Sequence, residues 1–254
     1  MKVVIIGSGN VATVLGKMIH HAGHAIVQVY GRNAGSVANV AGILSAEAVV
    51  DATAIDATAD IYLIAVSDNA IQAVAKQLSP NNKIVVHTSG AASKRILEGC
   101  TANYGVLYPL QSIRKEKLHT PAVPFLVDGA NDYTLELLKT FAAGFSPYVS
   151  VADDEQRLRL HIAAVFVSNF TNHLYAVTHD YCDKEAVPFN MLVPLIQETA
   201  LRLSDFPARA VQTGPAIRND NDTINRHLHE LENYPEMKIL YKLFTESIKG
   251  TYLK

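Results

Sequence analysis

Short runs of apolar, mostly β-branched residues recur through the first 150 residues and are separated by turn residues. Several runs are apolar at consecutive positions, which is typical of strands covered on both faces in a parallel sheet. Segments of helical length, such as Val11–His21 and Ala70–Leu78, lie between them. Strands that alternate with helices at this spacing predict βαβ units. The expected strands are Val3–Ile6, Ile26–Tyr30, Ile61–Val66, Ile84–His87, Phe125–Val127 and Tyr148–Val151.

The pattern changes near Ala152 and predicts helices from there on. Asp153, Asp154 and Glu155 are candidates for the N-cap and the first turn of a long helix. The segment Leu158–Val177 is apolar on most sides, as in helices buried in a bundle or a subunit interface. We therefore expect an α/β domain at residues 1–152 and an all-α domain at 153–254. Prolines 188, 194, 207, 215 and 235 divide the second domain into shorter helices.

Composition narrows the class of protein. The chain has 254 residues, of which 49% are hydrophobic and 18% charged, and this excludes a disordered chain or a coiled coil. A net charge of −2 provides no basic field for nucleic acid or an anionic membrane. Cys100 and Cys182 are too few and too far apart for a disulfide framework or a structural zinc site. No apolar run reaches the about 20 residues of a membrane span. We expect a cytoplasmic protein that needs no metal.

The strongest chemical signal is the sequence Gly7-Ser8-Gly9-Asn10-Val11-Ala12, a G-x-G-x-x-A motif. It follows an apolar strand directly and opens an apolar-periodic helix, which is the context that dinucleotide binding requires. Gly7 permits a tight turn, Gly9 lets the backbone approach a pyrophosphate, and Ala12 lets helix and strand pack closely. The free N–H groups of the helix N-terminus then face the anion. The alternative is an ordinary glycine turn.

The end of the second expected strand favours NADP over NAD. NAD-binding folds usually place an Asp or Glu there for the ribose hydroxyls. This chain has Tyr30-Gly31-Arg32-Asn33 instead. A guanidinium at that point can bind the 2′-phosphate of NADP with a forked contact. Arg32 as a solvated surface residue is the alternative.

Two further strand ends are expected at the same edge of the sheet. They are Ala65-Val66-Ser67-Asp68-Asn69-Ala70-Ile71 and His87-Thr88-Ser89-Gly90. In open α/β sheets, ligands lie outside the carboxyl ends of the strands. We expect Ala65, Val66, Ser67, Ile71, Thr88 and Ser89 to contact the cofactor, together with residues 7–11 and 31–33. Asp68 is equally well interpreted as an N-cap of the following helix.

These motifs occur together with Tyr108-Pro109-Leu110-Gln111-Ser112, His161-x7-Asn169 and Thr213-Gly214-Pro215-Ala216-Ile217-Arg218. In this combination the chain resembles the Rossmann-like NADP oxidoreductases that carry an uncharacterised helical C-terminal domain. That family is related in architecture to pyrroline-carboxylate reductase, ketopantoate reductase and the β-hydroxyacid dehydrogenases. The resemblance covers nearly the whole chain. It implies a Rossmann doubly wound parallel sheet, an all-α domain like that of 6-phosphogluconate dehydrogenase, and an NADP site in the cleft between them.

The resemblance also implies candidates for catalysis. Related dehydrogenases place Lys and Asn on the first long helix after the Rossmann domain, and here His161 falls near the lysine position. Asn169 lies eight residues further on, which brings both side chains to one face of a regular helix. His161 could protonate a developing alkoxide, and Asn169 could orient the substrate oxygen. Both residues as buried, backbone-bonded groups are the alternative.

Gly214 and Arg218 are candidates for substrate binding. A Gly-Pro turn inside a helical domain predicts a loop, from which Arg218 could reach a carboxylate or phosphate. Satisfying helix carbonyls is its alternative role. Arg218-Asn219-Asp220 stands where relatives usually have Arg-Gly-Asp, although Asn also tolerates the left-handed conformation.

The sequence thus predicts an NADP-dependent oxidoreductase that transfers hydride to or from a small carbonyl, hydroxyl or imino substrate. A catalytically silent NADP(H)-binding redox sensor or partner-binding module is the alternative, because fold alone does not decide function. The apolar Leu158–Val177 helix predicts a homodimer that forms through the helical domain.

Overall fold

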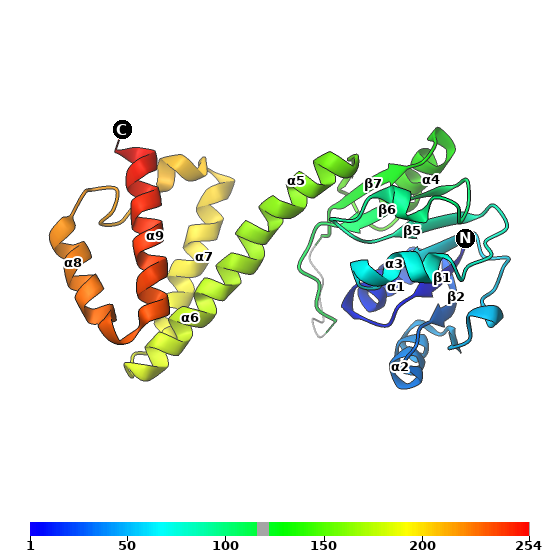
Figure 1. The fold of residues 1–254 in the computed structure, drawn as a ribbon, viewed down its shortest axis with the longest axis horizontal. Helices are drawn as coiled ribbons and strands as arrows, with labels where there is room; N and C mark the ends of the chain where they lie inside the picture. Colours follow the sequence, from blue (N-terminus) through cyan, green and yellow to red (C-terminus); the bar gives the residue numbers. More distant parts are fainter. Residues whose placement is uncertain (116–121, 254) are drawn as a thin grey trace. The chain divides into compact units, whose positions relative to one another are not determined.

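The computed structural model describes residues 1–115 and 122–253. These residues form two compact units, and the division between them falls between Ser168 and Asn169. The first unit is built on an eight-stranded sheet across the described residues, in the order β3-β2-β1-β4-β5-β6-β7-β8 (Figure 1). Its strands are β1 (Lys2–Ile6), β2 (Ala25–Tyr30), β3 (Glu47–Val49), β4 (Ile61–Ile64), β5 (Ile84–His87), β6 (Tyr104–Pro109), β7 (Phe125–Gly129) and β8 (Val149–Val151). Strands β1 to β6 are parallel to one another, while β7 runs antiparallel to β6 and parallel to β8. The order 3-2-1-4-5-6 is that of a dinucleotide-binding sheet.

Helices cover both faces of this sheet. They are α1 (Asn10–His21), α2 (Ala34–Leu44), α3 (Asp68–Ala75) and α4 (Asp132–Ala143), with short η1 (Ala52–Ala54) and η2 (Lys94–Leu97). A further helix, α5 (Asp154–Ala164), follows β8. On one face, Val3 and Ile5 of β1 belong to a core shared with α1, α2 and α4. On the other face, Val4 and Ile6 belong to a core shared with α3 and η2. The consecutive apolar positions therefore reflect a strand buried on both faces, as the sequence predicts.

The second unit consists of helices and loops. Its elements are α6 (Thr171–Lys184), η4 (Phe189–Leu192), α7 (Val193–Leu201), η5 (Arg202–Ser204), η6 (Ala208–Val211), α8 (Asn221–Glu230), η7 (Leu231–Asn233) and α9 (Pro235–Tyr252), coloured yellow-green to red in Figure 1. The π-helical segment η3 (Val165–Phe170) follows α5 and precedes α6. None of the described helices has the length and apolar character that crossing a membrane requires.

The first compact unit extends to Ser168, because Asp154 and Arg157 at the start of α5 are hydrogen-bonded to the loop after β5. The domain boundary at Ala152 stays a prediction. Asp153 is the N-cap of α5, and its carboxylate accepts from the backbone N–H of Gln156 at 2.8 Å. The side chain of Gln156 completes a capping box. The helix thus starts at the acidic residues, where the sequence predicted its start. Arg157, one turn into α5, is 1% exposed.

Candidate active site

A cavity of about 1050 Å³ lies at the carboxyl ends of β1, β2, β4, β5 and β6. Its volume is at the upper end of the range of small-molecule sites. Residues 7–11, 31–33, 65–67 and 88–89, which the sequence predicts as cofactor contacts, line this cavity. Ile71 does not: its side chain is 1% exposed and packs in the core beneath α3. The reason is that Ile71 lies on the face of α3 that is turned toward the sheet, so the cavity lining gives its predicted cofactor contact no support.

The glycine turn at one side of the cavity has the geometry that its sequence predicts. Gly7 has a φ of 126°, and a Cβ at this position would stand 2.2 Å from the carbonyl oxygen of Ala65. Gly9 is the N-cap of α1, and a Cβ there would meet no atom within 4 Å. Only glycine fits the first position, whereas the second leaves open space next to the backbone.

The N-terminus of α1 adds an electrostatic feature to this open space. No side chain caps the helix, and its first turn contains no acidic residue. The carbonyl of Gly9 accepts from the N–H and the hydroxyl of Thr13, at 3.0 and 2.9 Å. The N–H groups of the residues between them lack a helical acceptor, as at every helix start. An anion such as a pyrophosphate fits this end of the cavity.

Arg32 and Asn33 line the cavity beyond the end of β2. Arg32 is exposed, and no hydrogen bond or ion pair joins it to another described residue. The side chain of Asn33 caps α2 by accepting from the N–H of Ser36 at 2.9 Å. Asp68 is the acidic residue among the described lining residues, and it follows β4 rather than β2. It begins α3, while Ser67 holds the N-cap position, so Asp68 is not the cap we considered.

Tyr108 and His161 line the cavity together and are hydrogen-bonded to each other. The hydroxyl of Tyr108, at the end of β6, lies 3.0 Å from Nδ1 of His161 in α5. Both rings pack closely against Gly90 in the loop after β5, because a Cβ on this glycine would lie 2.8 Å from each ring. Burial raises the pKa of Tyr108, and the Arg157 guanidinium partly opposes this shift. The phenol is therefore protonated at neutral pH and can donate.

Tyr108 was not predicted as a site residue, because β6 was not recognisable as a strand from the sequence. A signal was present: an apolar segment ends at Tyr108-Pro109, and its last residues carry a hydroxyl to the edge where the other strands end. His87, at the end of β5, does not reach the cavity. Its ring is fully buried, and burial, reinforced by the charge of Arg157, lowers its pKa to about 4.

Comparisons with known proteins agree with this architecture. A Rossmann-like domain model matches residues 1–111, and a model described as a domain of unknown function (DUF2520) matches residues 123–248. Among solved structures, the chain is similar to a protein named "putative NADP oxidoreductase" from Bacteroides fragilis, with 36% identity over 98% of both chains and a TM-score of 0.90. This chain belongs to the same Rossmann-like, DUF2520-containing family.

More distant structures share the fold of this family. An imine reductase from Myxococcus stipitatus in complex with NADP+ has 14% identity and a TM-score of 0.70, and the match covers 99% of this chain and 96% of that one. A 1-pyrroline-5-carboxylate reductase from Streptococcus pyogenes has 12% identity and a TM-score of 0.65, and the match covers 99% and 98%. No curated protein matches the chain.

The three remaining site residues that the sequence predicts, Asn169, Gly214 and Arg218, lie in the second unit. Asn169 is exposed and lies within the π-helical segment η3, so the regular helical spacing from His161 that we assumed does not hold. Gly214, with a φ of 112°, lines an apolar cavity of about 250 Å³ within the unit. Arg218 is exposed, and Asn219 after it has a φ of 54°. Asn219 thus adopts the left-handed conformation, which asparagine tolerates. The roles of the three candidates stay predictions.

Within the described residues, no group of three or more His, Cys, Asp or Glu side chains is arranged to hold a metal ion.

Proposed function

We propose that the cavity of the first unit binds NADP(H) and that the protein transfers hydride between this cofactor and a small carbonyl, hydroxyl or imino substrate. The glycine turn and the uncapped N-terminus of α1 support binding of the pyrophosphate. Arg32, exposed and without a carboxylate partner among the described residues, supports a contact to the 2′-phosphate.

The single observation that carries the proposed reaction is the Tyr108–His161 pair in the wall of the same cavity. The nicotinamide, when bound, supplies or accepts the hydride. Reduction of a carbonyl or an imine also requires a proton for the oxygen or nitrogen atom. We assign this proton to the pair: the imidazolium form of His161 gives it up and becomes neutral imidazole, and the hydroxyl of Tyr108 orients the ring through its hydrogen bond with Nδ1. Asn169, Gly214 and Arg218 complete the proposal as substrate contacts of the second unit, on the family resemblance.

The test has two parts. NADPH and NADH are titrated into the protein by fluorescence, and NADPH oxidation is then measured against a panel of keto acids, imino acids and cyclic imines. Tighter binding of NADPH than of NADH and turnover of one substrate class support the proposal. Tight binding without turnover, together with capture of a protein partner, favours the redox sensor instead. Absence of binding overturns both.

We also propose that the protein is a homodimer and that the second unit forms the interface. In the described part of this unit, the buried apolar residues are Cys182, Ala216, Ile224 and Leu231. The large clusters of buried apolar residues all lie in the first unit. Exposed in this unit are Met191, Leu195, Leu201, Leu203, Phe206, Leu243 and Phe244. A helical unit with so little core of its own requires cover from a partner chain.

A cytoplasmic location is consistent with this proposal, since both Cys100 and Cys182 are free thiols.

A further inference from the structure

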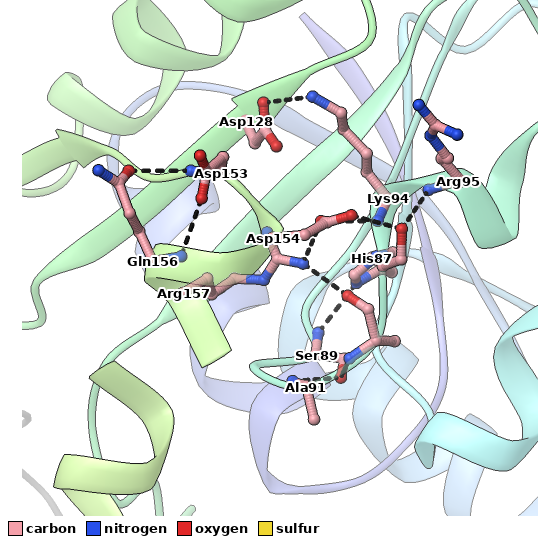
Figure 2. A network of polar contacts seen from close by, with 12 residues as sticks. His87, Ser89, Ala91, Lys94, Arg95, Asp128, Asp153, Asp154, Gln156 and Arg157 are labelled. Carbon is pink, nitrogen blue, oxygen red and sulfur yellow. Dashed lines mark hydrogen bonds and ion pairs between the residues drawn. The ribbon is translucent and has the colours of Figure 1, made fainter. Parts of the chain in front are cut away.

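The buried side chain of Arg157 joins two walls of the candidate active site. Its Nη2 donates to the carbonyl oxygen of Ala92 at 2.6 Å and to Oδ1 of Asp154 at 2.6 Å (Figure 2). Ala92 belongs to the loop that follows β5, whereas Arg157 and Asp154 belong to the first turns of α5. The guanidinium therefore bridges a loop of the α/β core and the helix that carries His161.

Asp154 makes the same connection from the helix side. Its carboxylate accepts from the hydroxyl of Ser93 and, at 3.0 Å, from the backbone N–H of Lys94 (Figure 2). The loop is also braced internally, because the hydroxyl of Ser89 accepts from the N–H groups of Ala91 and Ala92, at 3.1 and 2.9 Å. Residues 88–93 thus have little freedom to move relative to α5.

This loop and this helix meet again at the cavity. Gly90 of the loop contacts both the His161 ring and the Tyr108 ring, and a Cβ on Gly90 would stand 2.8 Å from each. His161 follows Arg157 by four residues and therefore lies one turn further along the same face of α5. A change in the distance between loop and helix would shift His161 against Tyr108, whose hydrogen bond is 3.0 Å long.

A contribution to the stability of the fold does not by itself explain why Arg157 is buried. Arg157 is 1% exposed, and its Nε and Nη1 atoms have no hydrogen-bond partner among the described residues. Its carboxylate partner Asp154 is 35% exposed. Apolar residues in place of both members of a buried ion pair are often neutral or stabilising, so a buried and incompletely paired charge is weak evidence for a role in stability. Arg157 does not line the cavity either, so it does not touch a ligand there.

We propose that Arg157 is a positioning residue, which fixes the loop of residues 88–93 against α5 and thereby holds His161 and Tyr108 in hydrogen-bonding register at the cavity wall. The role in catalysis rests on the proposed function, whereas the structural role does not. The charge of Arg157 also acts on the electrostatics of this region, since it disfavours the protonated form of His87 and opposes the rise in the pKa of Tyr108.

The experiment compares Arg157→Met with the matched control Arg159→Met. Arg159 lies on the same helix with its side chain 72% exposed, and it is paired with Glu155. The first readout is the nitrogen-15 NMR signal of Nδ1 of His161 in protein labelled at histidine, assigned by its loss in His161→Gln. The second is the melting temperature, the third NADPH affinity, and the fourth kcat with a substrate from the panel.

In Arg157→Met we expect the Nδ1 signal to move while NADPH affinity stays within about twofold, and kcat to fall about 10- to 100-fold, as for other remote misplacements. Arg159→Met should change none of these. A folded Arg157→Met protein whose Nδ1 signal is that of the wild type would overturn the proposal, even if the protein melts earlier.

If Arg157→Met does not fold, Arg157→Lys decides the question. A lysine ammonium keeps the charge but cannot reproduce the planar guanidinium contact to Ala92 and Asp154 together. The Nδ1 signal should move in this variant as well, and an unchanged signal again overturns the proposal. The NMR readout requires neither cofactor nor substrate. A wild-type protein without NADPH binding or turnover would therefore contradict the proposed function and leave the positioning role to be judged on the NMR signal.

Discussion

The hydroxyl of Tyr108 lies 3.0 Å from Nδ1 of His161, and the two rings are nearly perpendicular, at 83°, with centroids 5.8 Å apart. The two residues are 53 positions apart in the chain and reach the cavity from a strand and a helix. A tyrosine that orients a histidine through one ring nitrogen fixes the ring for work at the other.

Replacing His161 should separate chemistry from cofactor binding. His161→Gln keeps a hydrogen-bonding group but cannot donate a proton near neutral pH. We expect kcat to fall about 100-fold or more while NADPH affinity stays within about twofold. Tyr108→Phe should lower kcat by less, because it removes only the orienting hydroxyl. Steady-state kinetics and fluorescence titration measure both effects. A His161→Gln protein with normal turnover that only melts earlier would show that His161 is a structural residue.

Arg32 should distinguish the two nicotinamide cofactors. A forked, charge-assisted contact contributes about 1.5–3 kcal/mol, so Arg32→Ala should weaken NADPH about 10- to 100-fold. NADH affinity should barely change, because NADH has no 2′-phosphate. Arg95→Ala is the control, since Arg95 is exposed and does not line the cavity. An equal loss for both cofactors in a titration contradicts the assignment of Arg32 to the phosphate.

Gly90 should tolerate no side chain. In Gly90→Ala, the new Cβ would meet ring atoms of His161 and Tyr108 at 2.8 Å, so the wall of the cavity must shift. We expect a loss of about 1–3 kcal/mol in the free energy of unfolding and a lower kcat. Gly42→Ala is the control: Gly42 lies in α2 with no atom within 4 Å of its Cβ position. It should gain about 0.5–1 kcal/mol. Chemical denaturation measures both, and equal stability changes would argue against a tightly packed wall.

Buried His87 should make the protein sensitive to acid. Its pKa is about 4 in the folded state against 6.5 in the unfolded chain, first because of burial and then because of the charge of Arg157. Between these values the unfolded state binds more protons, so stability is lost as the pH falls from 6.5 toward 4. The loss should amount to about 3 kcal/mol.

The control for this prediction is His87→Gln, in which that part of the pH dependence disappears. His24 also has a lowered pKa, but it contributes equally to both proteins and cancels in the difference. Urea denaturation at pH 7 and pH 4.5 measures how the free energy of unfolding changes with pH in the wild type and in the variant. Parallel stability profiles for wild type and variant would show that His87 is not the group responsible.

The second unit should hold two chains together. Leu195 is 60% exposed on α7, and Leu195→Glu should convert the dimer to a monomer at micromolar concentration. Tyr133→Glu is the control, because Tyr133 is similarly exposed, at 63%, but lies on α4 of the first unit. Analytical ultracentrifugation measures both. A wild-type protein that sediments only as a 27.6 kDa species removes this prediction.

Local patterns predicted much of the first unit. Strands such as β1 and β5 were recognisable because burial on both faces leaves an unbroken apolar run. Strand β3 was missed, since it has three residues and only Val49 is buried. Strand β6 was missed because Gly105 and Pro109 interrupt its pattern. The helical run after Asp153 was predicted correctly, but its π-helical segment was not, since the apolar spacing does not distinguish the two helix types there.

The candidate site was likewise predictable only where its chemistry depends on local sequence. The glycine turn was predictable because its chemistry lies within six consecutive residues. The meeting of Tyr108 with His161 was not, since it depends on β6 lying beside β5 and on the way α5 packs. Arg157 was equally hidden: a charged residue in a helix predicts a solvated side chain, and only tertiary structure shows it buried.

The antiparallel strand β7 has a consequence for any dissection of this protein. The DUF2520 match starts at residue 123 and therefore includes β7, α4 and β8, yet β7 is hydrogen-bonded along its length to β6, next to the end of the Rossmann-like match at residue 111. The seam between the two family matches thus runs between neighbouring strands of one sheet. If the chain is cut at this seam, β6 becomes an unpaired edge strand of the first fragment and β7 an unpaired edge strand of the second. Leu107 and Val127, which are fully buried in the whole chain, then lie on these exposed edges. Neither fragment is a domain in the folding sense, and a truncation meant to isolate one half should keep β6 and β7 together.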